Sequence, residues 1–401
     1  MLMTGCSGAG PAKSITLGEV VRVGLPGFSQ SHRLPAHHWK VLRAIAACHT
    51  PALGGHQYQC AHCGEGHFVP HSCGNRHCPS CQKLNGAQWL EQQTELLLPI
   101  PYFHVVFTLP HELNLLIRHN QASLYALLFA GATATLLEFG RNNLKATLGV
   151  TAVLHTWGQN LGDHYHLHCV VTGGGLALDG PSWVSAPPNW LFAVRALSVV
   201  FRAKFRDGLQ QLFNDGQLQF PSSEPRLAAP AVFAHWRRRL CRHKWVVYTK
   251  RPFAGPQAVL AYLCRYTHRV AITNSRLETL DLQNGTVTFR YKDYAHQSQI
   301  RSMTLPLAEF LRRFCLHILP LRFVKIRHYG LLSNRNRSAR IAQARALLAQ
   351  VPSPSEEPEE AVLIIKHVEA PPLVCPRCGH CALVLVAIIN RPKATAIWDT
   401  S

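Results

Sequence analysis

This sequence of 401 residues has few acidic residues and no long apolar run. Only 21 Asp and Glu stand against 41 Lys and Arg, and no trio of acids stands out, which counts against a nuclease built on three carboxylates. The longest apolar runs, such as 381–389, are about half of the ~20 residues that span a bilayer. The first 14 residues have neither a charged leader nor an apolar stretch of useful length, so we expect no secretory signal there. We therefore expect a cytoplasmic protein with no membrane segment, whose 14 cysteines stay reduced.

The basic surplus is the main feature of the composition. The formal net charge is +20, and the simplest use of such a surplus is to neutralise a polyanion. We therefore expect a nucleic acid as the partner; the alternative is a ribosomal-like or merely soluble basic protein. Apolar residues make up 47% of the chain, so most of it should fold, and its length exceeds the ~250–300 residues of one core.

Composition divides the chain into six segments. These are a loose lead-in over 1–30, a zinc-binding domain over 31–95, a catalytic domain over 96–298, a basic helical region over 299–345, an acidic linker over 346–362 and a cysteine-containing tail over 363–401. The catalytic segment predicts strands at 102–109, 150–156, 165–172 and 244–249, helices at 113–139, 191–213 and 257–268, and a hairpin at 279–289 around Asn284-Gly285. The irregular mixture indicates an α+β fold with an antiparallel sheet.

Two C-x-x-C pairs lie fourteen residues apart in the zinc-binding segment: Cys60 with Cys63, and Cys78 with Cys81. This spacing is typical of tetrahedral Zn²⁺ sites, in which the metal stabilises a module with few large apolar residues. Other residues nearby leave a different set of four ligands, or a second ion, open: Cys73, His77, Cys48, His49 and His56.

Two further features of the cysteine-rich segments leave alternatives open. Arg76 and Lys83 lie beside the cysteine pairs and could contact DNA, although the zinc could equally serve only to hold the module together. The tail has a third cysteine motif at 375–381, which is half of a zinc site or a tail without metal.

A histidine pair and a tyrosine pair are the candidate catalytic residues. His166 and His168 are two apart on a predicted strand, so both imidazoles project from one face and can chelate one ion. Tyr262 and Tyr266 are four apart on a predicted helix, which puts both hydroxyls on one side. Arg265 and Arg269 flank them, and nearby cations favour the phenolate that would attack a phosphate. The alternative for the tyrosines is ordinary core packing.

Taken in order, several blocks of the chain resemble the transposases of the insertion-sequence 91 family, two-tyrosine members of the HUH endonucleases. The blocks are 72–82, 103–110, 155–161, 166–171 and 262–272. The resemblance covers about residues 36–345. This chain departs from the family pattern at Tyr165, where members often have proline, and at Gly74, where they usually have arginine.

The resemblance implies a bacterial protein that binds DNA at the nucleoid, with an HUH-type antiparallel sheet flanked by helices and preceded by a small zinc-binding domain. It also implies a third polar ligand beside His166 and His168; Gln159 is our candidate, with His155 and Asp163 as alternatives. A Mg²⁺ or Mn²⁺ ion there would bind the scissile phosphate of single-stranded DNA. Tyr262 or Tyr266 would attack it to give a tyrosine-5′-phosphate during rolling-circle-like transposition.

The region after residue 320 alternates cations with aromatic residues, a pattern typical of a cradle for single-stranded DNA. Its candidate DNA-binding residues are Lys325, Arg327, Arg335 and Arg337, and Tyr329 is a fallback nucleophile. A solvated basic surface is the alternative. Two other functions stay open: a plasmid replication initiator or relaxase with the same chemistry, and a zinc-dependent DNA-binding regulator without catalysis.

Overall fold

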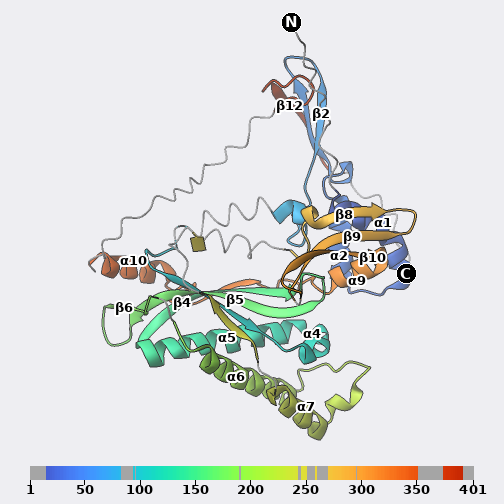
Figure 1. Ribbon diagram of the computed structural model, residues 1–401. Helices are drawn as coiled ribbons and strands as arrows, with labels where there is room; N and C mark the ends of the chain where they lie inside the picture. The colour runs from blue at the N-terminus through green and yellow to red at the C-terminus, as the bar shows by residue number, and fades with distance from the viewer. Residues whose placement is uncertain are drawn as a thin grey trace.

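The computed structural model describes residues 15–82, 94, 96–188, 191–242, 245–250, 258–259, 270–294, 296–350 and 374–391. Figure 1 shows a large sheet with helices below it, a smaller sheet beside short helices, and a narrow sheet that projects from the rest. Every strand pairing in these sheets is antiparallel. The fold is therefore α+β with antiparallel sheets flanked by helices, as the sequence predicts.

The largest sheet, which we call the central sheet, has the strand order β11-β4-β5-β3-β7, with β6 paired to β5. Its strands are β3 (Tyr102–Thr108), β4 (Ala146–Trp157), β5 (Asp163–Ala177), β6 (Trp183–Ser185), β7 (Val247–Lys250) and β11 (Ile326–Gly330). The strands predicted at 102–109, 150–156 and 165–172 are confirmed as β3, β4 and β5. The strand predicted at 244–249 corresponds to β7, which begins three residues later.

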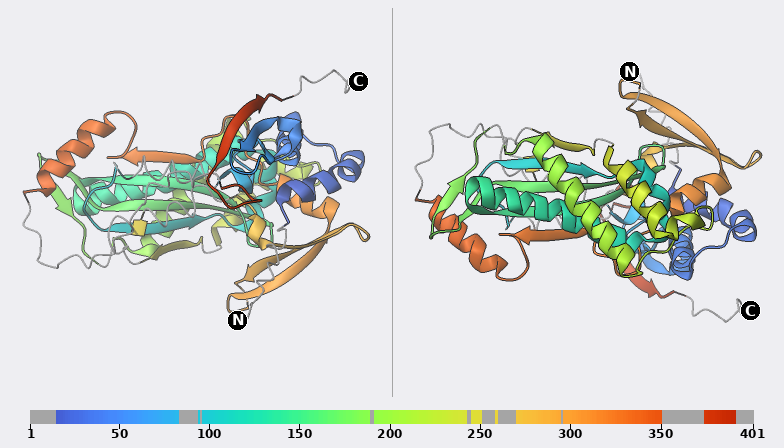
Figure 2. Two further views of the ribbon diagram at one scale, coloured as in Figure 1. Left: turned by 90° about the horizontal axis from the view of Figure 1, so that it is seen from above. Right: turned by 90° about the horizontal axis from the view of Figure 1, so that it is seen from below.

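Helices cover one face of this sheet, as the right-hand view of Figure 2 shows. They are α4 (Asn114–His119), α5 (Gln121–Leu144), α6 (Val194–Asn214) and α7 (Pro230–Arg242). Leu167 and Cys169 of β5 are buried in the core that these helices share with the sheet. Helix α5 is long and apolar enough to cross a membrane, and half of its most apolar stretch is buried against the sheet and α6. The helix predicted at 113–139 is divided at Asn120, whose amide donates to the carbonyl oxygens of Leu116 and Gln219.

A second core joins the beginning of the described chain to residues beyond 270. It contains α1 (Leu17–Ser31), α2 (Ala36–Ala47), β8 (Leu277–Asp281), β9 (Thr286–Asp293), β10 (Gln299–Pro306) and α9 (Leu307–Cys315). Strands β8 and β9 confirm the predicted hairpin, and Gly285 at its turn has φ +61°.

Two expectations drawn from composition are wrong here. Residues 17–31 are not a loose lead-in, because a capping box between Thr16 and Glu19 starts α1 and its apolar face is buried. Residues 299–345 are not helical throughout, because they contain β10 and β11 as well as α9 and the start of α10 (Arg337–Leu348). Gly and Ser content hid the helical spacing of Leu17, Val20 and Phe28, and charge concealed the strands.

The narrow sheet has the order β12-β1-β2, with β1 (Gly55–Cys60), β2 (Gly66–Pro70) and β12 (Leu383–Ile389). Strand β12 belongs to the tail, yet it pairs with β1 over the full length of β1. The tail is therefore part of the same sheet as the zinc-binding segment. Most of the helix predicted at 257–268 and of the acidic linker lies outside the described residues.

Gly330 permits a close approach of β11 to β4 and offers a test of the central sheet. Its φ is +62°, and a Cβ there would overlap the carbonyl oxygen of Leu148. We expect Gly330→Ala to lower the free energy of unfolding by at least ~3 kcal/mol, because backbone strain and a clash add. Gly285→Ala, at a similar φ with open space around it, should cost only ~1 kcal/mol. Urea unfolding of both variants measures the difference, and equal losses would contradict it.

Candidate functional site

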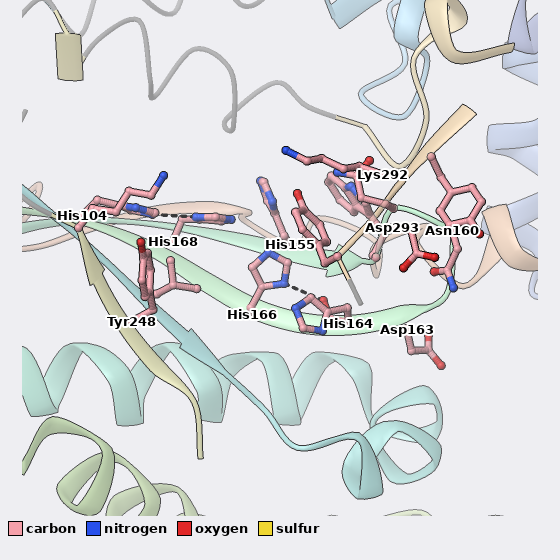
Figure 3. Close-up of a pocket in the computed structure, with 17 residues that line it drawn as sticks. His104, His155, Asn160, Asp163, His164, His166, His168, Tyr248, Lys292 and Asp293 are labelled. Atoms are coloured by element: carbon pink, nitrogen blue, oxygen red, sulfur yellow. Dashed lines mark hydrogen bonds between the residues drawn. The ribbon is translucent and has the colours of Figure 1, made fainter. Parts of the chain in front are cut away.

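Three histidines converge on the face of the central sheet opposite the helices (Figure 3). His155 on β4 is directly opposite His166 on β5, and His168 lies two residues further along β5 on the same side. One ring nitrogen from each of the three lies within 4.8 Å of the others. Three imidazoles at such separations can bind one metal ion.

Hydrogen bonds through Nδ1 orient His166 and His168 of β5. His166 Nδ1–H donates to the carbonyl oxygen of His164 at 2.8 Å. His168 Nδ1 lies 2.9 Å from Nε2 of His104 on β3. Burial, with a contribution from Lys250, lowers the pKa of His104 to about 3, so His104 is neutral and its Nε2 can accept a hydrogen bond from His168 Nδ1–H. In His166 and His168, Nε2 then carries the lone pair that a metal would use.

The histidines line an open cavity of about 600 Å³. Tyr248 and Lys250 of β7 line one part of it. The end of β9 and the residue after it line another part with Tyr291, Lys292, Asp293 and Tyr294. Lysine ammonium groups attract phosphate, and exposed aromatic rings can stack on bases. The cavity therefore combines a candidate metal centre with groups suited to a single nucleic-acid strand.

Of the candidates for a third ligand, the structure brings His155 to the histidine pair. Gln159 lines the same cavity, and its backbone carbonyl oxygen accepts a hydrogen bond from the Arg276 guanidinium. Asp163 turns away in Figure 3, and its carboxylate accepts hydrogen bonds from Arg118 Nε at 2.6 Å and Tyr165 Oη at 2.9 Å. Tyr165 thus binds Asp163 on the helix side of the sheet. Asp163 is excluded as a ligand in this arrangement, and Gln159 remains a prediction.

The first cysteine cluster consists of Cys48, Cys73, Cys78 and Cys81. Its sulfur atoms are 3.5–3.6 Å apart where they contact, too far for a disulfide and close to the edge of about 3.8 Å in a tetrahedron of Zn–S bonds. Cys48 follows α2, thirty residues before Cys78, and belongs to no C-x-x-C pair. The sequence marked it only as a neighbour of the motif.

The second cluster consists of Cys60, Cys63, Cys375 and Cys378. The fourteen-residue spacing suggested that the two C-x-x-C pairs of the zinc-binding segment share one ion. The structure instead places them in different clusters. The reason is that β1 and β2 extend between them and carry Cys60 and Cys63 away from the first cluster.

His77 and Arg76 connect the first cluster to residues 319–323, of which Leu319 and Phe323 belong to the core of the central sheet. His77 Nε2 accepts from the backbone N–H of Leu319 at 3.1 Å, and His77 Nδ1 lies 3.2 Å from Asn75 Oδ1. The Arg76 guanidinium donates to the carbonyl oxygens of Phe323 and Pro320, the latter at 3.0 Å. His77 therefore does not belong to either cysteine cluster, and Arg76 has protein partners where the sequence suggested DNA.

The basic residues after 320 differ in their surroundings. Lys325 lies over the ring of Trp157 at 5.2 Å, and burial lowers its pKa to about 7, with a contribution from Arg76. Arg327 lies over Phe129 at 4.3 Å, on the helix side of the sheet. Arg335 is exposed and Arg337 is partly exposed at the start of α10, so both remain candidate DNA contacts. Lys83, Arg265, Arg269, Tyr262 and Tyr266 lie outside the described residues.

Comparisons with known sequences find transposases over nearly the whole chain. Residues 20–109 match the family described as "Transposase zinc-binding domain", and residues 149–340 match that described as "Putative transposase". "Putative transposase y4qJ" of Sinorhizobium fredii is 43% identical over 391 residues, 96% of each chain. "Transposase for insertion sequence element IS801" of Pseudomonas savastanoi pv. phaseolicola is 31% identical over 353 residues, 86% of this chain and 82% of that one. No solved structure matches.

The α+β fold, the cysteine clusters and these relatives define a DNA transposase with a zinc-binding domain. The chain belongs to the insertion-sequence 91 family of transposases. Binding of DNA and a role in recombination follow from membership of this family. The cysteine clusters agree with structural Zn²⁺ in the N-terminal domain.

Cys48 tests the composition of the first cluster. We expect Cys48→Ser to remove one zinc ion per chain and to lower the free energy of unfolding by at least ~3 kcal/mol, because metal binding contributes directly to folding. Cys315→Ala is the control, since Cys315 is buried outside both clusters. Metal analysis and urea unfolding measure both effects. Unchanged zinc content in Cys48→Ser would contradict the assignment.

Proposed function

We propose that this transposase nicks and rejoins single-stranded DNA through a tyrosine-5′-phosphate intermediate, with Tyr262 and Tyr266 as nucleophiles. The observation that carries the proposal is the convergence of His155, His166 and His168 in a cavity lined by lysine and tyrosine side chains. A site of this kind suits a phosphodiester, which carries one negative charge beside flat bases. The family relationship makes DNA the substrate.

The three histidines would hold a divalent ion that polarises the scissile phosphate. Since all three ligands are neutral, none offsets the +2 charge, and its attraction for a phosphate oxygen is retained. Mg²⁺ prefers oxygen ligands, so three nitrogen donors favour Mn²⁺ of the two ions that we consider. The bond of His168 to His104 and that of His166 to the His164 carbonyl would keep the rings in place during turnover.

The described residues on either side of the tyrosine segment support its place in the site. Val259 is buried in the same apolar cluster as Val170, which lies two residues beyond His168 on the same face of β5. Val270 lines a smaller cavity with Trp157, whose ring stacks on His155 with 4.7 Å between centroids. Val259 and Val270, the described residues that flank the segment with Tyr262 and Tyr266, thus each share a cluster or a cavity with a residue beside the histidines.

The proposed reaction conserves the phosphoester. The phenol loses its proton and its oxygen bonds to phosphorus as the bond from phosphorus to the 3′ oxygen breaks. The 3′ oxygen takes up a proton and leaves as a 3′-hydroxyl, so no net proton is gained or lost. Rejoining reverses these steps with a second 3′-hydroxyl as the attacking group, so it requires no nucleotide cofactor. The second tyrosine would allow another strand transfer while the first covalent link persists. Lys250 and Lys292 would hold the strand by its phosphates.

Covalent capture tests the proposed nucleophiles. Labelled single strands carrying the element ends, incubated with the protein and Mn²⁺, should give an adduct on a denaturing gel that peptide mapping assigns to Tyr262 or Tyr266. The double variant Tyr262→Phe/Tyr266→Phe should lose it, and His166→Ala should reduce it at least ~100-fold because the phosphate loses its Lewis acid.

Tyr329→Phe is the matched control for this experiment. Tyr329 lies on β11 and packs against the core beneath the sheet, where burial raises the pKa of its phenol. The adduct should therefore form as in the unmodified protein. An adduct that survives in the double phenylalanine variant would refute the assignment, and the absence of any adduct would favour a DNA-binding regulator.

His104 tests how the candidate metal centre is organised. His104→Phe removes the acceptor for His168 Nδ1, so we expect the Mn²⁺ concentration needed for half-maximal nicking to rise ~10–100-fold. His328→Phe is the control, because His328 lies on β11 with its Nδ1 at 3.0 Å from Thr151 Oγ1, one strand further from β5 than His155 is. Saturating Mn²⁺ should restore much of the rate in His104→Phe. An unchanged Mn²⁺ requirement would contradict this role.

A further inference from the structure

Two short turns more than 300 residues apart have the same backbone geometry. Cys60–Gly64 and Cys375–Gly379 both read C-x-x-C-G, with glycine φ values of +72° and +75°. In each turn the glycine N–H donates to the carbonyl oxygen of the first cysteine, at 2.8 and 2.9 Å. The N–H of that first cysteine donates to the carbonyl oxygen of the residue after the glycine, at 2.8 Å in both turns. Such turns aim two thiolates at one ion.

The two turns face each other, and each cysteine sulfur of one turn contacts a cysteine sulfur of the other. Cys60 Sγ lies 3.7 Å from Cys378 Sγ, and Cys63 Sγ lies 3.7 Å from Cys375 Sγ. These distances exclude disulfides and match the edge of about 3.8 Å expected for four sulfurs around Zn²⁺. All four sulfur atoms lie within 4.8 Å of one another.

Side chains around the cluster join the same two segments. His67 Nε2 lies 3.2 Å from Cys375 Sγ, and Arg377 forms an ion pair with Glu65. Next to the cysteines, Ala61 N–H donates to the Ala382 carbonyl oxygen at 2.8 Å, and β12 continues as a partner of β1. Every one of these contacts is between the tail and residues 55–67.

Apolar burial contributes little to this attachment. Val384, Val386 and Ile388 of β12 are each 57–58% exposed, and the described residues of the narrow sheet supply few members of any apolar cluster. A small sheet without a core usually depends on a metal or a covalent bond for stability. The cysteine cluster is the feature that can supply it.

We propose that Cys60, Cys63, Cys375 and Cys378 bind a second structural Zn²⁺, which ties the tail to the N-terminal zinc-binding domain. The family match to that domain ends at residue 109 and does not include the tail. The site uses ligands 312–318 residues apart, so it can be complete only after the chain has been synthesised to Cys378. It is independent of the nuclease chemistry proposed above.

Metal analysis of the full-length reduced protein tests the number of ions. The unmodified chain should contain two zinc ions, and Cys375→Ser/Cys378→Ser should contain one. Cys60→Ser/Cys63→Ser should also contain one, and the variant with all four serines should still contain one, because the pairs share an ion. Cys381→Ser is the matched control: it belongs to the same tail motif, lies outside the cluster, and should keep two.

Two results of the zinc measurement would overturn the proposal. One is a zinc content of one in the unmodified chain; the other is a content of two in the Cys375→Ser/Cys378→Ser variant. Retention of the first cluster's ion in that variant also reports that the rest of the domain has folded. Circular dichroism provides a second check of folding.

Cleavage of the chain tests whether the ion holds the tail in place. A protease site inserted between residues 350 and 374 would separate the tail from the rest after folding. The cleaved tail should co-elute with the larger fragment on gel filtration in the unmodified background and in Cys381→Ser. It should be released in Cys375→Ser/Cys378→Ser. Co-elution in that variant would show that strand pairing suffices and would overturn the proposed tie.

Discussion

The alternation of side chains along β5 is the constraint on which the candidate site depends. Leu167 and Cys169 must face the helices to complete the core, so His166 and His168 are directed to the other face. The register with β4 then brings His155 opposite His166. A shift of one residue in this pairing would bury the histidines in the core and expose Leu167, so the energetics of the core also maintain the geometry of the site.

The zinc-binding part of the protein obeys a different constraint. Its first cluster lies beside a substantial apolar core. His77 and Arg76 connect this cluster to residues 319–323. Lys325, two residues further on, lies over Trp157, which stacks on His155. The cluster and the histidine centre are thus linked through a short series of contacts. The narrow sheet has little core, and there sulfur ligands stand in for apolar burial.

Several features could be predicted because their causes are local. The strands β3, β4 and β5, helix α6 and the turn at Asn284-Gly285 follow from periodicity and turn chemistry, and the His-x-His spacing on a strand implies a shared face. Charge was a poorer guide. Arg76 and Arg327 look like DNA contacts in the sequence. In the structure the Arg76 guanidinium donates to two carbonyl oxygens and the Arg327 guanidinium lies over an aromatic ring. A guanidinium group serves equally well in such structural contacts.

The sequence alone determined the α+β class and the family resemblance, and it predicted metal binding by the cysteines and by the pair His166 and His168. These depend on spacing within a single element or turn, where the backbone sets the geometry. Only the tertiary structure decided that His155 lies beside the pair and that the Asp163 carboxylate accepts hydrogen bonds from Arg118 and Tyr165. It also decided that Cys48 and the tail cysteines complete the two clusters. Those partners come from other strands and segments, and their meeting depends on strand register and chain path, which residue spacing does not encode.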